Sequence, residues 1–589
     1  MLLSPSLAPE DNADARPGAA SLALAFAAVT LPTLIAYNLP PSATFFNQAA
    51  AYVGWGAWVA LLASLPGVSL AAQWPGGLRA LLAALVLLAA AAAAAPLWAA
   101  LPWTLALSSI GTIAAAVVVA VAGAALARAG RAQPAFEALC VALLAAGVVG
   151  ALIGIEQVFA PQWTDGDWIA RIGNGRAAGN LRQPNHLSSL LLWSLVALAW
   201  LAGRRRVGRA ATIGLGGLLL AGVVLSASRT GMLGVLLLGA WGLADRRLPR
   251  GVRAGLIGAP VAFALLWLGL AALAHDSHHL FGGDAQLDKG DISSSRFAIW
   301  ANTLALIAAH PWLGVGWGEF NFVWTLTPFP GRPVAFFDHT HNLPLQFAVE
   351  LGLPLAALVL ALLGIALWRA FKAAGETRDD AEHATLRAAF VMVLLMALHS
   401  QLEYPLWYAH FLLPTAFAFG LCLGGTRQTA AAQNAPQGSR TLLLGGALIV
   451  LGALAALADY ARVVVIFAPP AGAAPLDERI AEGKRSVLFG HHADYAEVTT
   501  PGQVIDPVTA FRRAPHYLLD ARLMMAWAYA LAAWGDTDKA SYLAARLAEF
   551  HNEQAHAFFA PCDEPPKEGE EPPFQCEPPK RALTYRDFR

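Results

Sequence analysis

The chain has 589 residues, of which 57% are hydrophobic and 13% charged, and its 39 basic and 39 acidic residues give a formal net charge of zero. A soluble protein of this size carries about a quarter charged residues, so the composition excludes an ordinary soluble enzyme. The zero net charge also argues against a general nucleic-acid-binding protein. Long apolar runs, several close to the ~20 residues needed to cross a bilayer, indicate a polytopic helical membrane protein.

The N-terminal segment 1–18 is polar and contains Asp11, Asp14 and Arg16, so we expect a cytoplasmic tail rather than a cleaved signal peptide. The apolar runs that follow predict about thirteen membrane-spanning helices. Their expected positions are 19–37, 49–70, 78–98, 104–127, 134–156, 187–203, 210–227, 231–244, 255–273, 343–368, 386–400, 406–424 and 441–458. The predicted fold class is therefore all-α, with a transmembrane domain at 19–458.

Basic residues in alternate short connections predict the orientation of these spans. They are Arg79, Arg128, Arg131, Arg204, Arg205, Arg206, Arg209, Arg246, Arg247, Arg250, Arg253, Arg369, Lys372, Arg427 and Arg440. Short loops rich in Lys and Arg stay in the cytoplasm. We therefore expect the loops at 157–186, 274–342 and 401–405 to lie in the periplasm of a bacterium, with the chain in the inner membrane.

Residues 459–589 are much more charged and are expected to form a periplasmic helical domain with a Pro- and Glu-rich tail. The stretch "LLDARLMMAWAYALAAWGDTDKASYLAARLAEFHNEQAHAFF" has apolar residues at helical spacing, interrupted by Gly535 and Asp536, which predicts a helical hairpin. One such hairpin cannot bury its own apolar face, so we expect it to pack on neighbouring helices or on the membrane domain.

The four cysteines fall into two groups. Cys140 and Cys422 lie in predicted spans and are expected to be inert apolar residues. Cys562 and Cys576 flank the Pro- and Glu-rich tail in a compartment that permits disulfides, which favours a bridge. A flexible tail with two free thiols is the alternative.

Four polar motifs stand out, and the first is "GNGRAAGNLRQPNHLSSLL" at 173–191. Helix capping explains Pro184 and Asn185. Capping does not explain Arg182, Gln183 and His186 beside them, and the start of a helix favours an anion.

The second motif is "SASRTGML" at 226–233. Arg229 is either an interfacial anchor or a ligand for phosphate. The third is "DISSSRFAIWANTLALIAAHPWLGVGWGEF" at 291–320, in which Arg296 begins an amphipathic helix. A lone arginine in such a helix is either a solvated or packing residue or part of the same anion site.

The fourth motif, "FFDHTHNLPLQF", crowds titratable side chains into residues 336–347, and "HSQLEYPLWY" at 399–408 can join it. A metal site made of Asp338, His339 and His341 is disfavoured, because neighbouring positions rarely point at one ion and no HExxH or cysteine pattern supports it. A proton or ion path needs ionisable residues in mid-span, and the spans have almost none. Acid–base chemistry at the outer membrane face remains, in which a histidine accepts a proton while arginines hold a polyanion.

In this order, "RQPNHL", "SASRTG", "SRFAIWANTLALIAAHPWLGVGWGEF", "HTHNLPLQFAVELG" and "HSQLEYPLWY" resemble the bacterial O-antigen ligase and O-oligosaccharyltransferase superfamily of membrane glycosyltransferases. "LPTLIAYNLPPSATFFNQ" and the extra C-terminal domain resemble its protein-glycosylating, PglL-type branch. The resemblance covers residues 30–460 clearly. It implies a transferase that moves an oligosaccharide from undecaprenyl pyrophosphate to Ser or Thr hydroxyls of periplasmic proteins such as pilin, with no metal or other cofactor.

Rival hypotheses differ in the acceptor or in the class of protein. An O-antigen ligase would use the lipid A–core of lipopolysaccharide, and a polymerase would join repeat units. A transporter or lipid flippase would show charged or helix-breaking residues in mid-span and related halves, and the sequence shows neither.

The resemblance also implies roles for single residues. His341, which precedes Asn342 and the correctly placed Gly352, is the expected catalytic base. Leu355 replaces the second glycine of the ligase signature, which weakens assignment to the lipopolysaccharide ligase branch. Arg229 and Arg296 are expected to bind the pyrophosphate. The remaining expected substrate-binding residues are Arg182, Gln183, His186, His339, Asn342 and Tyr404. The C-terminal domain is expected to position the acceptor without supplying the base.

Overall fold

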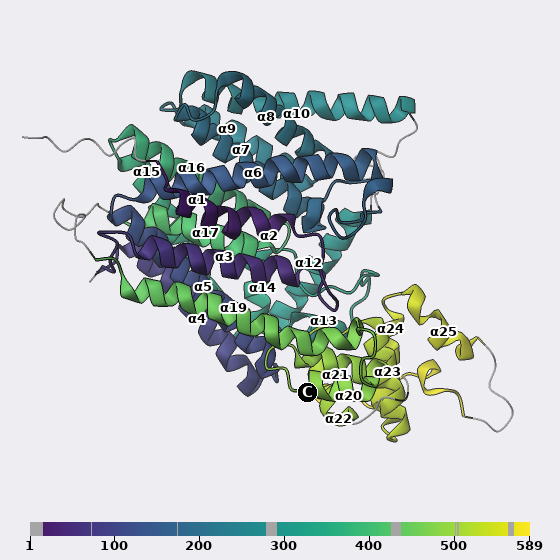
Figure 1. Cartoon of the computed structure of the whole chain (residues 1–589). Coiled ribbons are helices and arrows are strands. Elements are labelled where there is room, and N and C mark those ends of the chain that lie inside the picture. Colours follow the sequence, from purple (N-terminus) through teal and green to yellow (C-terminus); the bar gives the residue numbers. More distant parts are fainter. Residues whose placement is uncertain are drawn as a thin grey trace, which may run out of the picture.

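The structure is a computed structural model that describes residues 16–71, 73–173, 175–277, 291–425, 437–500, 502, 506–563 and 571–589. Within these ranges the regular structure is helical and contains no strand, which confirms the all-α class (Figure 1). The predicted N-terminal tail, apart from residues 16–18, lies outside the described residues, as do Arg427 and part of the loop at 274–342.

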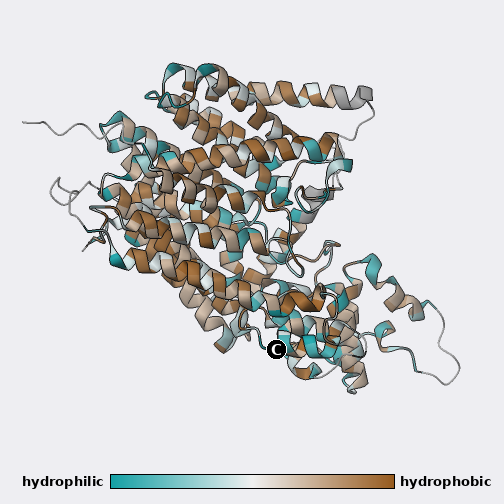
Figure 2. Cartoon of the chain, in the orientation of Figure 1, coloured by the Kyte–Doolittle hydropathy of each residue, from teal (hydrophilic) through white to brown (hydrophobic). Residues whose placement is uncertain are grey.

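The apolar part of the chain is a bundle of helices. Its members are α1 (Ala19–Ala25), the π-helical turn η2 (Phe26–Thr30), α2 (Leu31–Leu34), α3 (Phe45–Ala63), α4 (Gly76–Trp98), α5 (Trp103–Arg128), α6 (Ala132–Phe159), α7 (Pro184–Gly203), α8 (Arg209–Leu225), α9 (Arg229–Ala244), α10 (Arg250–Ser277), α15 (Leu353–Glu376), α16 (Asp380–His399), α17 (Ala409–Leu423) and α19 (Arg440–Phe467). Eight of the described helices, namely α4, α5, α6, α7, α10, α15, α16 and α19, are long and apolar enough to cross a membrane. The chain is a polytopic helical membrane protein, and ribbon coloured as hydrophobic runs through the whole bundle (Figure 2).

One predicted span, 343–368, is wrong as a single helix. The structure divides it into α14 (Leu343–Leu351) and α15, which meet at Gly352 with φ +75°. The break has a hydrogen-bonding cause: the Val349 carbonyl accepts from the Val315 N–H at 2.8 Å, and the Leu353 N–H donates to Pro311 at 2.7 Å. Only α15 has the length and apolar character of a span.

Small residues allow close helix packing inside the bundle. Helix α3 lies against α19, and α5 against α17. A methyl group added at Gly56 would meet the Gly446 carbonyl oxygen at 2.7 Å, and one added at Gly446 would meet the Gly56 carbonyl oxygen at 2.5 Å. The two backbones therefore touch, as expected where dispersion contacts between small residues drive helix association in a bilayer.

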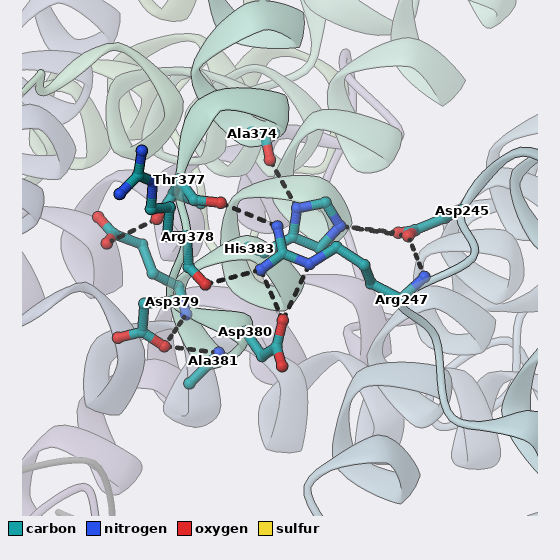
Figure 3. A network of polar contacts seen from close by, with 10 residues as sticks. Asp245, Arg247, Ala374, Thr377, Arg378, Asp379, Asp380, Ala381 and His383 are labelled. Atoms are coloured by element: carbon teal, nitrogen blue, oxygen red, sulfur yellow. Dashed lines mark hydrogen bonds and ion pairs between the residues drawn. The ribbon is translucent and has the colours of Figure 1, made fainter.

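A polar network joins two loops that were predicted to share the cytoplasmic face (Figure 3). Arg247, after α9, donates to Asp380 at 2.9 Å and to the Thr377 carbonyl at 2.8 Å. His383 bridges the Ala374 carbonyl at 2.7 Å and the Asp245 carboxylate at 3.2 Å. These contacts fix the α9–α10 and α15–α16 connections against each other at the end of the bundle that carries the basic loops.

The C-terminal helices form a lobe at the other end of the bundle, together with α12 (Asp291–Ala309) and α13 (Phe320–Leu326) (Figure 1). The helices in the connections are η3 (Pro161–Trp163), η4 (Gly179–Leu181), α12, α13, α14 and η5 (Pro405–Trp407). The C-terminal helices are α20 (Leu476–Gly483), α21 (Gly490–Thr499), α22 (Pro507–Arg513), η6 (Ala514–His516), α23 (Ala521–Ala533), α24 (Thr537–Ala548), η7 (Glu553–Ala555), α25 (His556–Phe559), η8 (Ala560–Cys562), η9 (Phe574–Cys576) and η10 (Tyr585–Phe588).

The predicted helical hairpin is confirmed as α23 and α24, separated at Gly535, which has φ +85°. Its apolar face packs on α12 and α13, which belong to the predicted loop 274–342. The helix that leads into this lobe, α19, continues past the expected boundary at 458 and ends at Phe467. The lobe is therefore built from both a loop of the membrane domain and the C-terminal segment.

Two polar side chains hold the C-terminal segment in place: Glu319 at the end of the third motif, and Asn321 just after it. Glu319 accepts from His516 Nδ1 at 2.7 Å, and both side chains are buried. The Asn321 amide accepts from the Leu519 N–H at 2.7 Å and donates to the Phe337 carbonyl at 2.9 Å. One amide thus connects the C-terminal segment to the residue that precedes Asp338.

Arg332 forms a second set of polar contacts that stabilises the lobe. Its guanidinium forms an ion pair with Glu549 at 3.0 Å and lies over the rings of Trp324 and Phe550, at 4.8 and 4.5 Å from their centroids. Its side chain is fully buried. A buried guanidinium needs this set of partners, and the set joins α13 to the end of α24.

Cys562 and Cys576 form a disulfide, so the favoured bridge is confirmed. Cys140 and Cys422 are free and buried in α6 and α17, as expected for small apolar residues.

We expect Arg332→Lys to loosen the lobe, because a lysine keeps the charge but loses the planar face and most of the hydrogen bonds. The loss should be about 2–4 kcal/mol of local stability. Hydrogen exchange of the amides in α24, measured in the full-length protein, should then be faster. Arg586→Lys is the matched control, because Arg586 lies on an exposed ring contact with Tyr585 at 5.8 Å. Equal protection of α24 in both variants would contradict this role for Arg332.

Candidate functional site

The site is organised around the carboxylate of Glu403, which is buried in the turn between α16 and α17. One oxygen, Oε2, lies 2.9 Å from His341 Nδ1. The other, Oε1, accepts from Arg296 Nη2 at 2.8 Å and from Asn185 Nδ2 at 3.0 Å. Glu403 therefore brings together segments of the first, third and fourth motifs.

Asn185 also links the first motif to the second. Its Oδ1 accepts from the Ser228 hydroxyl at 2.6 Å, next to Arg229 at the start of α9. The Ser228 hydroxyl also accepts from Ser188 at 2.9 Å and from the Gly231 N–H at 3.0 Å. The four motifs thus meet through hydrogen bonds at one end of the bundle.

The backbone presents His341 in an unusual conformation, with φ +54°. A residue with a side chain rarely adopts this left-handed region, so its neighbours must hold it there. Thr340 donates its N–H to Gln346 Oε1 at 2.8 Å, and its carbonyl accepts from Trp300 at 3.0 Å. Asn342 caps α14 by accepting from the Leu345 N–H at 3.1 Å.

The pairing with Glu403 determines which nitrogen of His341 is free. A carboxylate only accepts hydrogen bonds, so Nδ1 carries the hydrogen and Nε2 keeps its lone pair. Burial disfavours the charged form of Glu403, but the hydrogen bond and charge of His341, with the charge of Arg296, lower the pKa of this carboxyl below its ordinary value. Glu403 is thus an anion that orients the imidazole and can stabilise an imidazolium.

Three guanidinium groups lie around this one carboxylate. Arg296 forms its ion pair with Glu403. Arg176 donates to the carbonyls of Ser226 at 3.0 Å and Ala227 at 3.2 Å. Its pKa is lowered to about 10, mainly by burial and then by the charge of Arg229, with opposite and smaller effects of Glu403. Within the described part of the chain the Arg229 side chain makes no hydrogen bond or ion pair. Three guanidinium groups and one carboxylate leave an excess of positive charge here.

The other expected residues of the first motif have structural partners. Gln183 caps α7 by accepting from the His186 N–H at 2.8 Å, so capping explains more of this motif than expected. Arg182 donates to the Ala36 carbonyl. His186 is buried, and its ring lies 4.6 Å from that of Tyr408 and 5.2 Å from that of Phe411. Substrate contacts by these three residues stay predictions.

His339 and Tyr404 form a stacked pair beside His341. Their ring centroids lie 4.3 Å apart at 14°, and His341 lies 5.2 Å from Tyr404. Asp338 approaches His339 Nδ1 at 3.1 Å. Burial raises the Tyr404 pKa, and the charge of Asp338 raises it further. Because Asp338 pairs with His339 and His341 pairs with Glu403, the three side chains do not converge on one point.

An apolar cavity of about 580 Å³ lies between α4, α5, α15, α16 and α17, next to this cluster. Its lining includes Leu85, Ile113, Leu360 and Phe419 in the membrane helices. At one end it reaches Ser400, Gln401 and Trp407. The Ser400 carbonyl accepts from the Leu343 N–H at 2.8 Å, and the Gln401 carbonyl accepts from Asn342 at 3.2 Å. This end of the cavity therefore adjoins the segment that carries His341.

Sequence reasoning missed Glu403 and Arg176. Both residues lie inside the motif stretches. However, neither the glutamate before Tyr404 nor the arginine in the glycine-rich loop stands at a spacing that indicates a function. Only the close approach of the loops makes them neighbours of His341 and Arg229.

The chain is similar to several known families and proteins. A family model described as O-antigen ligase matches residues 214–360, one described as the C-terminal part of a membrane-bound polymerase virulence factor matches 387–561, and one described as protein glycosylation ligase matches 177–202. A general O-oligosaccharyltransferase of Acinetobacter baylyi is 26% identical over 260 residues, which is 43% of this chain and 44% of that protein. A ComP-specific O-oligosaccharyltransferase of the same organism is 27% identical over 257 residues, 42% of this chain and 44% of that protein.

These matches confirm the resemblance to the O-antigen ligase and O-oligosaccharyltransferase superfamily. The chain spans less than half of the length of the two relatives, so their activity is not assigned to it by similarity alone.

Glu403→Gln tests the centre of the site. The amide keeps the size but loses the charge that orients His341 and pairs with Arg296, so turnover should fall roughly 10²–10⁴-fold if His341 acts as a base. Turnover per folded molecule, measured with saturating substrates, reports the effect. Glu549→Gln, which removes the ion pair with Arg332 away from the site, is the control. Similar turnover in the two variants would show that Glu403 only packs the loop.

Proposed function

From this confirmed similarity we propose that the protein is a glycosyltransferase that transfers an oligosaccharide from undecaprenyl pyrophosphate to Ser or Thr hydroxyls of periplasmic proteins. The observation that carries the proposal is the His341–Glu403 pair, 2.9 Å apart, beside three arginines and an apolar cavity. We propose that the site lies at the periplasmic face of a bacterial inner membrane, because the basic loops, which stay in the cytoplasm, are at the other end of the bundle.

The arginines suit the leaving group. A pyrophosphate needs little help from a general acid, because it departs as a stable anion, but it needs positive charge around it. One guanidinium group can donate to two phosphate oxygens at once. Arg229, whose side chain forms no ion pair among the described residues, is the first ligand we propose, and Arg176 and Arg296 complete the group.

His341 supplies the base. Its Nε2 takes the proton of the acceptor hydroxyl while that oxygen bonds to the anomeric carbon of the glycan. The bond between the anomeric carbon and the phosphate oxygen breaks, and its electron pair leaves with the lipid pyrophosphate. Glu403 stabilises the imidazolium that forms, and the proton then returns to water.

The apolar cavity suits the lipid. A polyprenyl chain has no polar atoms, so it can lie among membrane helices while its pyrophosphate reaches the loops. The cavity lies within the helices and ends beside Asn342, which supports this placement.

The acceptor is the point on which the rival hypotheses differ. Both relatives are O-oligosaccharyltransferases by name, which favours a protein acceptor. The match to the O-antigen ligase model over 214–360 keeps lipid A–core as the second candidate.

The function is tested in a strain that lacks this gene. Wild-type protein should restore glycan on periplasmic proteins, and His341→Ala, produced at the same level, should not. In purified form His341→Ala should lose about 10²–10⁴-fold in turnover because the base is gone. His339→Ala should be milder, because His339 contacts Tyr404 and Asp338 rather than Glu403. Restoration of glycan on lipopolysaccharide alone would select the ligase instead, and normal turnover of folded His341→Ala would overturn the mechanism.

Arg229→Lys tests the donor site. The lysine keeps one charge but cannot pair with two phosphate oxygens, so kcat/KM for the donor should fall about 10–100-fold. Arg171→Lys is a matched control, because Arg171 is an exposed arginine that donates to the Thr164 carbonyl at 3.2 Å in the same outer loop. Unchanged donor kinetics in Arg229→Lys would make this residue an interfacial anchor.

A further inference from the structure

A tyrosine of the C-terminal segment lies near the candidate site. Tyr517 follows η6 and keeps 45% of its surface accessible. It nevertheless interacts electrostatically with Asp338, Tyr408 and Tyr460, which come from three distant segments. Tyr517 is therefore an accessible ring of the C-terminal segment within electrostatic range of the loops around the candidate site.

The backbone around Tyr517 is fixed from both sides. His516, before it, binds Glu319 at 2.7 Å, and Leu519, after it, donates to Asn321 at 2.7 Å. Asn321 in turn holds the Phe337 carbonyl at 2.9 Å. The position of Tyr517 relative to Asp338 is therefore set by hydrogen bonds and does not depend on apolar packing alone.

Two histidines of α21 stand against the Tyr517 ring. The ring centroids of His491 and His492 lie 4.4 and 4.8 Å from that of Tyr517. His491 is 4% exposed, and neither of its ring nitrogens has a hydrogen-bond partner among the described residues. Burial, and then the charge of His492, lower the His491 pKa, so the imidazole is neutral and offers one donor and one acceptor.

The chemistry of these groups matches a sugar. The rings of Tyr404 and Tyr408 are stacked 6.2 Å apart, near the Asp338 carboxylate, which is 45% exposed as a side chain. Pyranose rings present C–H faces that pack on aromatic rings, and hydroxyls that donate to carboxylates and exchange hydrogen bonds with neutral imidazoles.

We infer that Tyr517, with His491 and His492 against it, forms part of a saccharide-binding surface that faces Asp338 and Tyr408, and that this surface holds the glycan of the donor. The inference rests on the proposed function. It gives the C-terminal segment a share in donor recognition, in addition to the acceptor role expected from the sequence.

The test uses the purified full-length protein, with the lipid-pyrophosphate-linked oligosaccharide varied at fixed acceptor and then the acceptor varied at fixed donor. Tyr517→Ala should raise the donor KM about tenfold, because it removes one aromatic contact, with kcat changed little. Tyr517→Phe keeps the ring and should stay close to wild type. Tyr529→Ala is the matched control, because Tyr529 is a 51% exposed tyrosine of α23 that contacts Phe558 and Phe574 instead.

A binding measurement separates this inference from the proposed reaction. Saturation-transfer NMR with the free oligosaccharide, released from its carrier, should detect contact with the wild-type protein and a weaker signal with Tyr517→Ala, whether or not transfer occurs. Tyr517→Leu serves if the alanine variant does not fold. An unchanged donor KM and NMR signal, or a rise in the acceptor KM alone, would overturn the inference. Wild-type protein that binds the oligosaccharide but transfers none would refute the proposed function and leave the saccharide site standing.

Discussion

The buried carboxylate of Glu403 is the group on which the candidate site depends. An ionised carboxylate is costly to bury unless its oxygens are paired, and here they are paired with His341, Arg296 and Asn185. Each partner comes from a different motif. The cost of burying this one carboxylate without partners therefore favours the close approach of the loops. The same contacts orient the imidazole and leave its other nitrogen free. Structural and chemical requirements are thus met by one set of hydrogen bonds.

The lobe beside the membrane bundle is a joint construction. The predicted loop 274–342 contributes α12 and α13, the C-terminal segment contributes α23 and α24, and their apolar side chains form one core. Glu319, Asn321 and Arg332 add polar fastenings to that core. The predicted periplasmic loop at 274–342 thus contributes half of a folded unit, which explains how this segment can hold His341 in a left-handed conformation.

Much of this arrangement could be predicted from the sequence, and the reasons differ from one part to the next. The membrane helices follow from apolar length, and the hairpin around Gly535 from helical periodicity, because both are local properties. The family followed from five motifs in order. Glu403 and Arg176 could not be predicted, because their importance comes from loops that are distant in sequence and meet only in the fold. The break at Gly352 was missed for the same reason: the carbonyl of Val349 bonds to Val315, a residue far upstream. The cap formed by Gln183 was not predicted, because a helix N-cap is usually made by a shorter side chain.

The side-chain amide of Asn321 has a consequence for how such proteins can be recombined. It lies at the interface between the C-terminal segment and the loop before His341, where it accepts from the Leu519 N–H and donates to the Phe337 carbonyl. Neither segment can shift along this interface without breaking one of these hydrogen bonds, so the two segments form one rigid unit. A chimaera that exchanges the C-terminal domain at the end of α19 would therefore divide that unit. An exchange should instead replace the whole lobe, so that α12 and α13 come from the same parent protein as the C-terminal helices.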